Sequence, residues 1–204
     1  SSCGNGARCV SAVVMDDLNK ASVIIETLSG PITARRADGD LVSVDMGPAQ
    51  LDWQDIPLAM EEDTNHINLV VGALSNPVAI SMGNPHVVFF VDSVDSVDLT
   101  DLGPIVETHA LFPKRTNVEI VEVIDRSHVR MRVWERGVGV TQACGTGACA
   151  VGVAAARRDL TDRAVRVTLD GGDLHVLWRD DGHVIMTGPV AETFSGLLDR
   201  DLLG

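Results

Sequence analysis

The pattern Cys-Gly-x-Gly-Ala occurs twice in this sequence, as Cys3-Gly4-Asn5-Gly6-Ala7 and as Cys144-Gly145-Thr146-Gly147-Ala148. Each copy opens a stretch that predicts a helix, over residues 5–19 and 145–158. A single copy would carry little weight, because small residues at a helix start often do no more than allow tight packing. Two copies in matching contexts indicate two halves that derive from one ancestral unit.

The second of these helices is unusual because alanine, glycine and valine cover all of its faces. A helix without a polar stripe is normally surrounded by protein, so we expect a sheet to wrap around residues 145–158. Most of the remaining chain alternates β-branched and polar residues in short runs, separated by turn signals such as Gly30-Pro31 and Asp38-Gly39. These runs predict strands in 22–36, 41–48, 67–74, 77–83, 87–92, 117–125, 127–135, 165–170, 174–180 and 183–188.

One further helix is predicted around residues 102–112, with Pro104 in its first turn, where a missing backbone N–H costs nothing. Because helices do not regularly separate the strands, the pattern favours an α+β fold over a doubly wound parallel sheet. Residues 49–65 are polar and proline-marked and predict a linker. We therefore expect an N-terminal half-domain in 1–48, a C-terminal half-domain in 66–190, and a segment in 191–204 that returns to the first half.

The chain starts at Ser1 without a methionine, two residues before the first motif. We therefore expect a leading segment to be missing and the first half to be incomplete. The first residues lack the pattern of a secretion signal, and no apolar run approaches the roughly 20 residues of a membrane-spanning helix. These features predict a cytoplasmic protein.

The formal net charge of −13 disfavours nucleic acids and anionic membranes as partners, because both would repel the chain. Four cysteines without a C-x-x-C pair argue against a zinc ribbon, a redox motif or a disulfide scaffold. Cys9 and Cys149 do not complete a metal-ligand set with the motif cysteines, and we interpret both as packing residues.

Each copy of the motif lies at a predicted helix N-terminus. Unpaired N–H groups and the helix dipole there favour an anion such as a substrate carboxylate. The same field is expected to lower the pKa of the neighbouring thiols of Cys3 and Cys144. Two thiols on opposite sides of one ligand would remove a proton from one face of a carbon and return one to the other. That reaction is a stereoinversion, and it requires neither a cofactor nor a metal if N–H groups hold the developing charge.

Other uses of the two motif cysteines fit less well. Nucleophilic catalysis would require a base next to one thiol and gives no reason for the duplication. A disulfide between Cys3 and Cys144 would be an inactivated form of the site.

Several motifs agree in order and spacing with one family: CGNGARC at 3–9, VDMGP at 44–48, GNPH at 83–86, LGPIVETHALFPKRTNVE at 102–119, WERGVGVTQACGTGACA at 134–150 and MTGP from 186. By these motifs the chain resembles diaminopimelate epimerase. The resemblance implies two pseudo-symmetric halves, each a curled mixed sheet wrapped around a central helix, with the active site between them. It also implies cofactor-independent interconversion of LL- and meso-diaminopimelate, a place in lysine and peptidoglycan biosynthesis, and a homodimer.

The resemblance assigns roles residue by residue. Cys3 and Cys144 become the two acid/base thiols, and His86 and Glu135 become polar neighbours that tune their pKa values. The resemblance also implies two groups of substrate-binding residues. Backbone amides at Gly4, Asn5, Gly145 and Thr146 would bind the reacting carboxylate. The side chains around the distal end of the substrate, which does not react, would be Asn84, Asn117, Glu135 and Arg136. The last group is chemically suitable, because Arg pairs with carboxylates bidentately and Glu pairs with an ammonium.

Two alternatives stay open at this point. A proline racemase or hydroxyproline epimerase would share the fold and the second cysteine motif. The sequence CGNG in the first motif, the GNPH motif and the Glu135-Arg136 pair favour a substrate with a second charged end. The chain could also be an inactive fragment that only binds a ligand, which would show as binding without hydrogen exchange at the α-carbon.

Overall fold

The computed structural model describes residues 4–27, 30–194 and 196, so Cys3 of the first motif lies outside the described residues. The helices are α1 (Gly4–Asp17), the 3-10 turn η1 (Val94–Ser96), α2 (Leu99–Glu107) and α3 (Gly145–Arg157). The strands are β1 (Ser22–Thr27), β2 (Gly30–Arg36), β3 (Leu41–Pro48), β4 (Val70–Val71), β5 (Leu74–Ser75), β6 (Val78–Ser81), β7 (Pro85–Val91), β8 (Asn117–Asp125), β9 (His128–Glu135), β10 (Gly139–Thr141), β11 (Ala164–Leu169), β12 (Gly172–Trp178) and β13 (His183–Pro189). The helices predicted over 5–19 and 145–158 are confirmed within a few residues.

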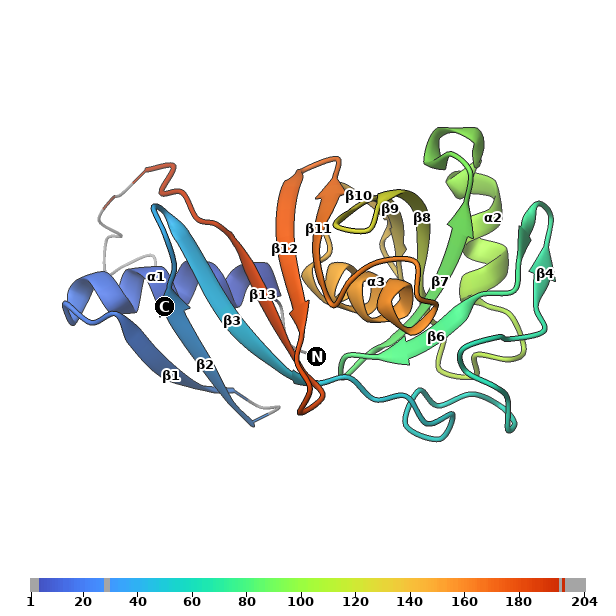
Figure 1. Cartoon of the computed structure of the whole chain (residues 1–204), viewed down its shortest axis with the longest axis horizontal. Coiled ribbons are helices and arrows are strands. Elements are labelled where there is room, and N and C mark those ends of the chain that lie inside the picture. The colour runs from blue at the N-terminus through green and yellow to red at the C-terminus, as the bar shows by residue number, and fades with distance from the viewer. Residues whose placement is uncertain (1–3, 28–29, 195, 197–204) are drawn as a thin grey trace, which may run out of the picture.

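Among the described residues, eleven strands form one mixed sheet in the order β1-β2-β3-β13-β12-β11-β9-β8-β7-β6, with β10 added beside β9. The pairs β7–β8 and β9–β11 are parallel, and the other neighbours are antiparallel. Figure 1 shows that the sheet curls around α3, while α1 lies along β1, β2 and β3 at the other end of the molecule. The α+β fold class is confirmed. The sheet encloses α3, whereas α1 is covered on one side only and exposes Val10 and Val13 on the other.

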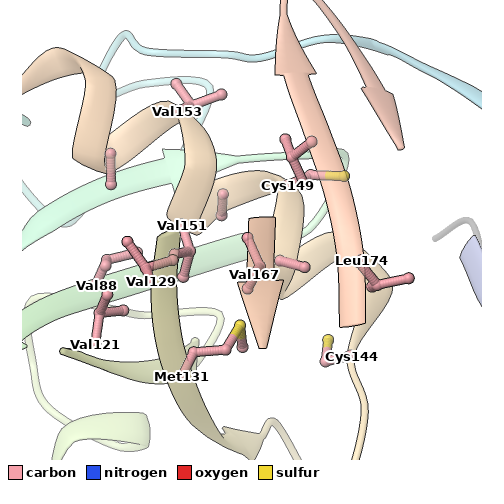
Figure 2. Close-up of a cluster of buried hydrophobic side chains, with 14 of the residues drawn as sticks. Val88, Val121, Val129, Met131, Cys144, Cys149, Val151, Val153, Val167 and Leu174 are labelled. Atoms are coloured by element: carbon pink, nitrogen blue, oxygen red, sulfur yellow. The ribbon is translucent and has the colours of Figure 1, made fainter. Parts of the chain in front are cut away.

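Helix α3 is the centre of the larger core. Its residues 145–155 are all buried, as the absence of a polar stripe predicts. Figure 2 shows Cys149, Val151 and Val167 among the buried side chains between this helix and the surrounding strands. The helix lies so close to β12 that a Cβ on Gly152 would be 2.7 Å from Val176 Cγ1. This close packing fixes where the first turn of α3, with its cysteine motif, sits in the fold.

Helix α1 packs on β1–β3 through a smaller core of Ala12, Met15, Ile32, Ala34, Val42 and Val44. Its buried face also includes Gly4, Arg8 and Ser11, at helical spacing. Cys9 lies off this face and is exposed, so its interpretation as a packing residue is wrong. Cys149, by contrast, is fully buried in the core around α3, and its interpretation as a packing residue is confirmed.

Helix α2 covers the face of β8 and β9 that is turned away from α3, at the right of Figure 1. It begins at Leu99, because the Asp98 carboxylate accepts hydrogen bonds from the backbone N–H groups of Thr100 and Asp101. Pro104 therefore lies inside the helix and not in its first turn, which corrects the expectation from the sequence. The reason is the Asp98 cap, which starts the helix at Leu99, three residues before the predicted start.

The strand β13 joins the two ends of the sheet, because it pairs with β3 on one side and β12 on the other. Residues 49–65, predicted as a linker, form turns and bury Ile56 and Leu58 in the core beneath α2. The division into half-domains stays a prediction. Within the described part of the chain, no helix is both long and apolar enough to cross a membrane.

Candidate active site

The first turns of α1 and α3 meet at the middle of the molecule. A Cβ placed on Gly145 would lie 3.4 Å from Gly4 Cα, 3.4 Å from Asn5 Oδ1 and 3.2 Å from Met186 Sδ. A Cβ on Gly4 would lie 2.8 Å from Met186 Cε. Glycine at both positions therefore allows the two helix starts to approach each other across Met186 of β13. The repeated motifs, which are far apart in sequence, thus form one site with two helix N-termini.

This arrangement brings together the backbone amides at Gly4, Asn5, Gly145 and Thr146 that the sequence assigns to a carboxylate. Two adjacent helix N-termini place two positive dipole ends at one point, which suits an anionic group. The side-chain oxygen of Asn5 is buried there and has no hydrogen-bond partner among the described residues. Among the described residues, the junction therefore leaves the Asn5 side-chain oxygen as an unused hydrogen-bond acceptor.

Cys144 is the N-cap residue of α3, and the residue is 6% exposed. Its Sγ accepts a hydrogen bond from the Gly147 N–H at 3.4 Å and lies 3.6 Å from Thr146 Oγ1. The sulfur is thus held at the junction of the two helices by contacts within its own motif.

The pKa of the Cys144 thiol is raised to about 12, contrary to the lowering expected from the helix field. Burial is the largest cause, and the nearby carboxyl groups of Glu119 and Glu135 add to it. The hydrogen bonds from Thr146 and Gly147 act in the opposite direction but are outweighed. The raised pKa favours the neutral thiol form of Cys144 near neutral pH.

Alkylation should distinguish the exposed Cys9 from the buried Cys144 and Cys149. With iodoacetamide at pH 8, we expect the exposed Cys9 to react while Cys144 and Cys149 stay unmodified, because both are buried and burial raises the pKa of both thiols to about 12. Peptide mass spectrometry of the native protein at several time points measures each site. Alkylation of Cys144 as fast as of Cys9 would show that the thiol is accessible and ionised.

A chain of polar contacts leads from Cys144 into the protein. Asn84 Nδ2 lies 3.4 Å from Thr146 Oγ1, and Asn84 Oδ1 lies 3.2 Å from His86 Nε2. The other ring nitrogen of His86 is 2.6 Å from Glu119 Oε1, and both of these side chains are fully buried. Burial raises the pKa of Glu119, opposed by its contact with His86. The structure thus brings the predicted residues Asn84, His86, Thr146 and Cys144 together in one line.

A second group surrounds the turn after β9. Asn117 accepts a hydrogen bond from the Arg136 N–H at 3.0 Å and donates one to the Pro85 carbonyl at 2.8 Å. The Arg136 guanidinium donates to the Lys114 carbonyl, and Glu135 accepts from the Thr141 hydroxyl at 2.5 Å. Asn117 therefore ties this turn to the start of β7, the strand that carries His86.

Two acidic residues near the site are absent from the sequence-based set. Glu107, at the end of α2, is buried and accepts hydrogen bonds from Trp134 Nε1 and from the Gly137 N–H, so it supports the turn that carries Arg136. Glu119 lies on the α3-facing side of β8 with Asn117 and Val121. A glutamate between Val118 and Ile120 in a predicted strand was the available sequence signal for Glu119.

Comparison with known proteins gives a consistent result. The family model described as "Diaminopimelate epimerase" matches residues 78–192. The diaminopimelate epimerase of Rhodospirillum centenum is 54% identical over 202 residues, which are 98% of this chain and 69% of that protein. That of Caulobacter vibrioides is 50% identical, over 96% of this chain and 70% of its own length.

Solved structures of other enzymes share the fold. A hydroxyproline epimerase from Agrobacterium vitis, with bound trans-4-hydroxy-L-proline, has a TM-score of 0.63 at 16% identity and covers 93% of this chain and 64% of its own. A phenazine biosynthesis protein from Bacillus anthracis has a TM-score of 0.61 at 18% identity, and the match covers 92% of this chain and 73% of that protein. At these identities the likeness concerns the fold alone.

Proposed function

The chain belongs to the diaminopimelate epimerase family, and from this premise we propose that it interconverts LL- and meso-diaminopimelate by proton transfer through two thiols, Cys3 and Cys144. The observation that carries the proposal is the meeting of the two cysteine motifs, with Gly4 and Gly145 in near contact. The role in lysine and peptidoglycan biosynthesis and a homodimeric assembly belong to the same proposal.

The reacting end of the substrate lies at the helix junction in this account. Its α-carboxylate accepts hydrogen bonds from backbone amides of both first turns, which stabilise the negative charge that develops when the α-proton leaves. Two helix N-termini are suited to that task because their amides are fixed before the substrate arrives and do not have to reorganise.

The proton transfer uses one thiol on each face of the α-carbon. Cys3, as a thiolate, takes the α-proton, and the Cys144 S–H gives its proton to the opposite face, so that the carbon inverts. Afterwards Cys3 is the thiol and Cys144 the thiolate, and the reverse reaction uses this form. The raised pKa of Cys144 supports its role as the proton donor of the resting enzyme.

The distal amino-acid end explains why the enzyme would select diaminopimelate. Arg136 pairs with the distal carboxylate and Glu135 with the distal ammonium, while Asn84 and Asn117 supply amide groups at the same end. The hydrogen bond from the Arg136 N–H to Asn117 supports this grouping. Proline and hydroxyproline have no second charged end, and the relatives at about 50% identity do not favour the racemase alternative.

Substrate discrimination tests the proposal. We expect the protein, kept reduced so that its thiols stay free, to convert LL-diaminopimelate to the meso form and to leave L-proline and trans-4-hydroxy-L-proline unchanged. Chiral chromatography of the three reactions measures the outcome. Inversion of a proline substrate, or binding of diaminopimelate without any conversion, would contradict the proposed function.

A further inference from the structure

We propose that Glu119 is a positioning residue for this reaction, because its buried carboxyl group fixes which way His86, and through it the Asn84 amide, faces the Thr146–Cys144 end of the site. This inference rests on the proposed function and adds to it a residue outside the predicted site. The contacts that carry it join four side chains: Glu119 on β8, His86 on β7, Asn84 just before β7, and Thr146 on α3.

The contacts form an unbroken path. Glu119 Oε1 lies 2.6 Å from His86 Nδ1, His86 Nε2 lies 3.2 Å from Asn84 Oδ1, and Asn84 Nδ2 lies 3.4 Å from Thr146 Oγ1. The parallel pairing of β7 and β8 places His86 directly beside Asn117, two residues before Glu119. The path therefore starts at the fully buried carboxyl group of Glu119 and ends at Thr146 Oγ1, which lies 3.6 Å from the Cys144 sulfur.

Burial restricts the protons that the pair holds. Both the Glu119 and the His86 side chains have no solvent exposure, so a net charge on the pair would be costly. A neutral pair holds two protons. A proton on Glu119 Oε2 would be a buried donor without a partner among the described residues. One proton therefore lies between Oε1 and Nδ1 and the other on His86 Nε2, which acts as a donor.

The donor at Nε2 determines the orientation of Asn84. Its Oδ1 accepts the hydrogen bond from His86, so its NH₂ group is turned to Thr146. If Glu119 is replaced by an apolar side chain, Nδ1 has no partner to settle which ring nitrogen holds the hydrogen. With the hydrogen on Nδ1, the bare Nε2 would repel Asn84 Oδ1, and the amide would turn its oxygen to Thr146.

The position of Glu119 against α3 supports this role. A Cβ on Gly147 would lie 2.8 Å from Glu119 Oε1, so the carboxyl group is in contact with the first turn of the helix that carries Cys144. Glu135, at the end of β9, and Cys144 are the further titratable groups that interact with this region. The second oxygen of Glu119 has no hydrogen-bond partner among the described residues, so the contact with His86 is what holds the carboxyl group in place.

The test compares Glu119→Leu, Glu119→Gln and a control, Val121→Ala, at the next position of β8 on the same face. Glutamine can donate an N–H to His86 Nδ1 and so keeps the hydrogen on Nε2, whereas leucine cannot. We expect kcat/KM for diaminopimelate to fall about 50-fold in Glu119→Leu and to stay within about fivefold of the parent in Glu119→Gln. Val121→Ala should lower the melting temperature but not kcat/KM.

Nitrogen NMR of the histidine rings gives a readout that does not depend on turnover. With His86 assigned by its loss in His86→Gln, we expect a protonated Nε2 in the parent protein and in Glu119→Gln, and a population with bare Nε2 in Glu119→Leu. A bare Nε2 in the parent, or no change in Glu119→Leu, would overturn the inference. So would a kcat/KM of Glu119→Leu equal to that of Val121→Ala. If the parent does not epimerise diaminopimelate, the proposed function fails, while the ring spectra still decide the role of Glu119.

Discussion

Replacement of Cys144 by alanine should lower kcat/KM for the epimerisation of diaminopimelate by about 1000-fold or more. A positioned acid or base typically contributes 100- to 10,000-fold, and no other thiol in the described structure is placed at the junction of α1 and α3. The loss should appear in both reaction directions, because the two thiols exchange roles. Steady-state rates from LL- and from meso-diaminopimelate measure this effect.

Cys149→Ala is the matched control for this variant. Cys149 lies on the same helix and is fully buried, so its truncation also removes a sulfur from the core around α3. We expect it to lower the melting temperature while leaving kcat/KM nearly unchanged. A Cys144→Ala variant that keeps the parent rate, or a Cys149→Ala variant that loses activity to the same extent, would remove Cys144 from the mechanism.

Replacement of Arg136 by alanine should raise KM for diaminopimelate by at least about 30-fold, with a smaller change in kcat. Truncating one partner of a hydrogen-bonded charge pair costs about 2–5 kcal/mol, and the lost contact is to the end of the substrate that does not react. Such a contact binds the ground state and the transition state alike. Initial rates over a wide range of substrate concentration separate KM from kcat.

Arg132→Ala serves as the control for Arg136. The Arg132 side chain lies on β9 and donates to the carbonyl groups of Val94 and Val97, away from the site. We expect a lower melting temperature for this variant and an unchanged KM. If Arg136→Ala has the KM of the parent, Arg136 does not bind the distal carboxylate, and the account of specificity fails.

Features that are encoded locally were predictable from the sequence. The helix over α3 follows from its uniform small and apolar residues, and the hairpin of β8 and β9 follows from two alternating runs around a turn. The pairing of the two cysteine motifs was also predictable, because a duplicated motif at two helix starts indicates duplicated function. Between them, however, lies Met186 on β13, and its MTGP motif does not by itself reveal contact with both helix starts.

Features that depend on several elements were not predictable in the same way. The sign of the Cys144 pKa shift is set by burial and by Glu119 and Glu135 on two other strands, whereas the sequence shows only the helix start. Cys9 is exposed because the face that α1 buries runs through Gly4, Arg8 and Ser11, and the sequence alone does not select that face. Glu119 was visible only as an acidic residue in a strand, without the His86 contact that gives it a role.

The central claim is that two different thiols act on opposite faces of one carbon, and the most direct test is the fate of solvent hydrogen. The parent protein is given LL-diaminopimelate in D₂O, and product and recovered substrate are analysed by mass spectrometry early in the reaction. We predict one deuterium at the inverted α-carbon of the meso product and none in the recovered LL substrate, because Cys3 keeps the proton it removes while Cys144 donates a deuteron. Meso product that retains the substrate proton, or deuterium appearing equally in recovered LL substrate, would contradict a mechanism with two thiols.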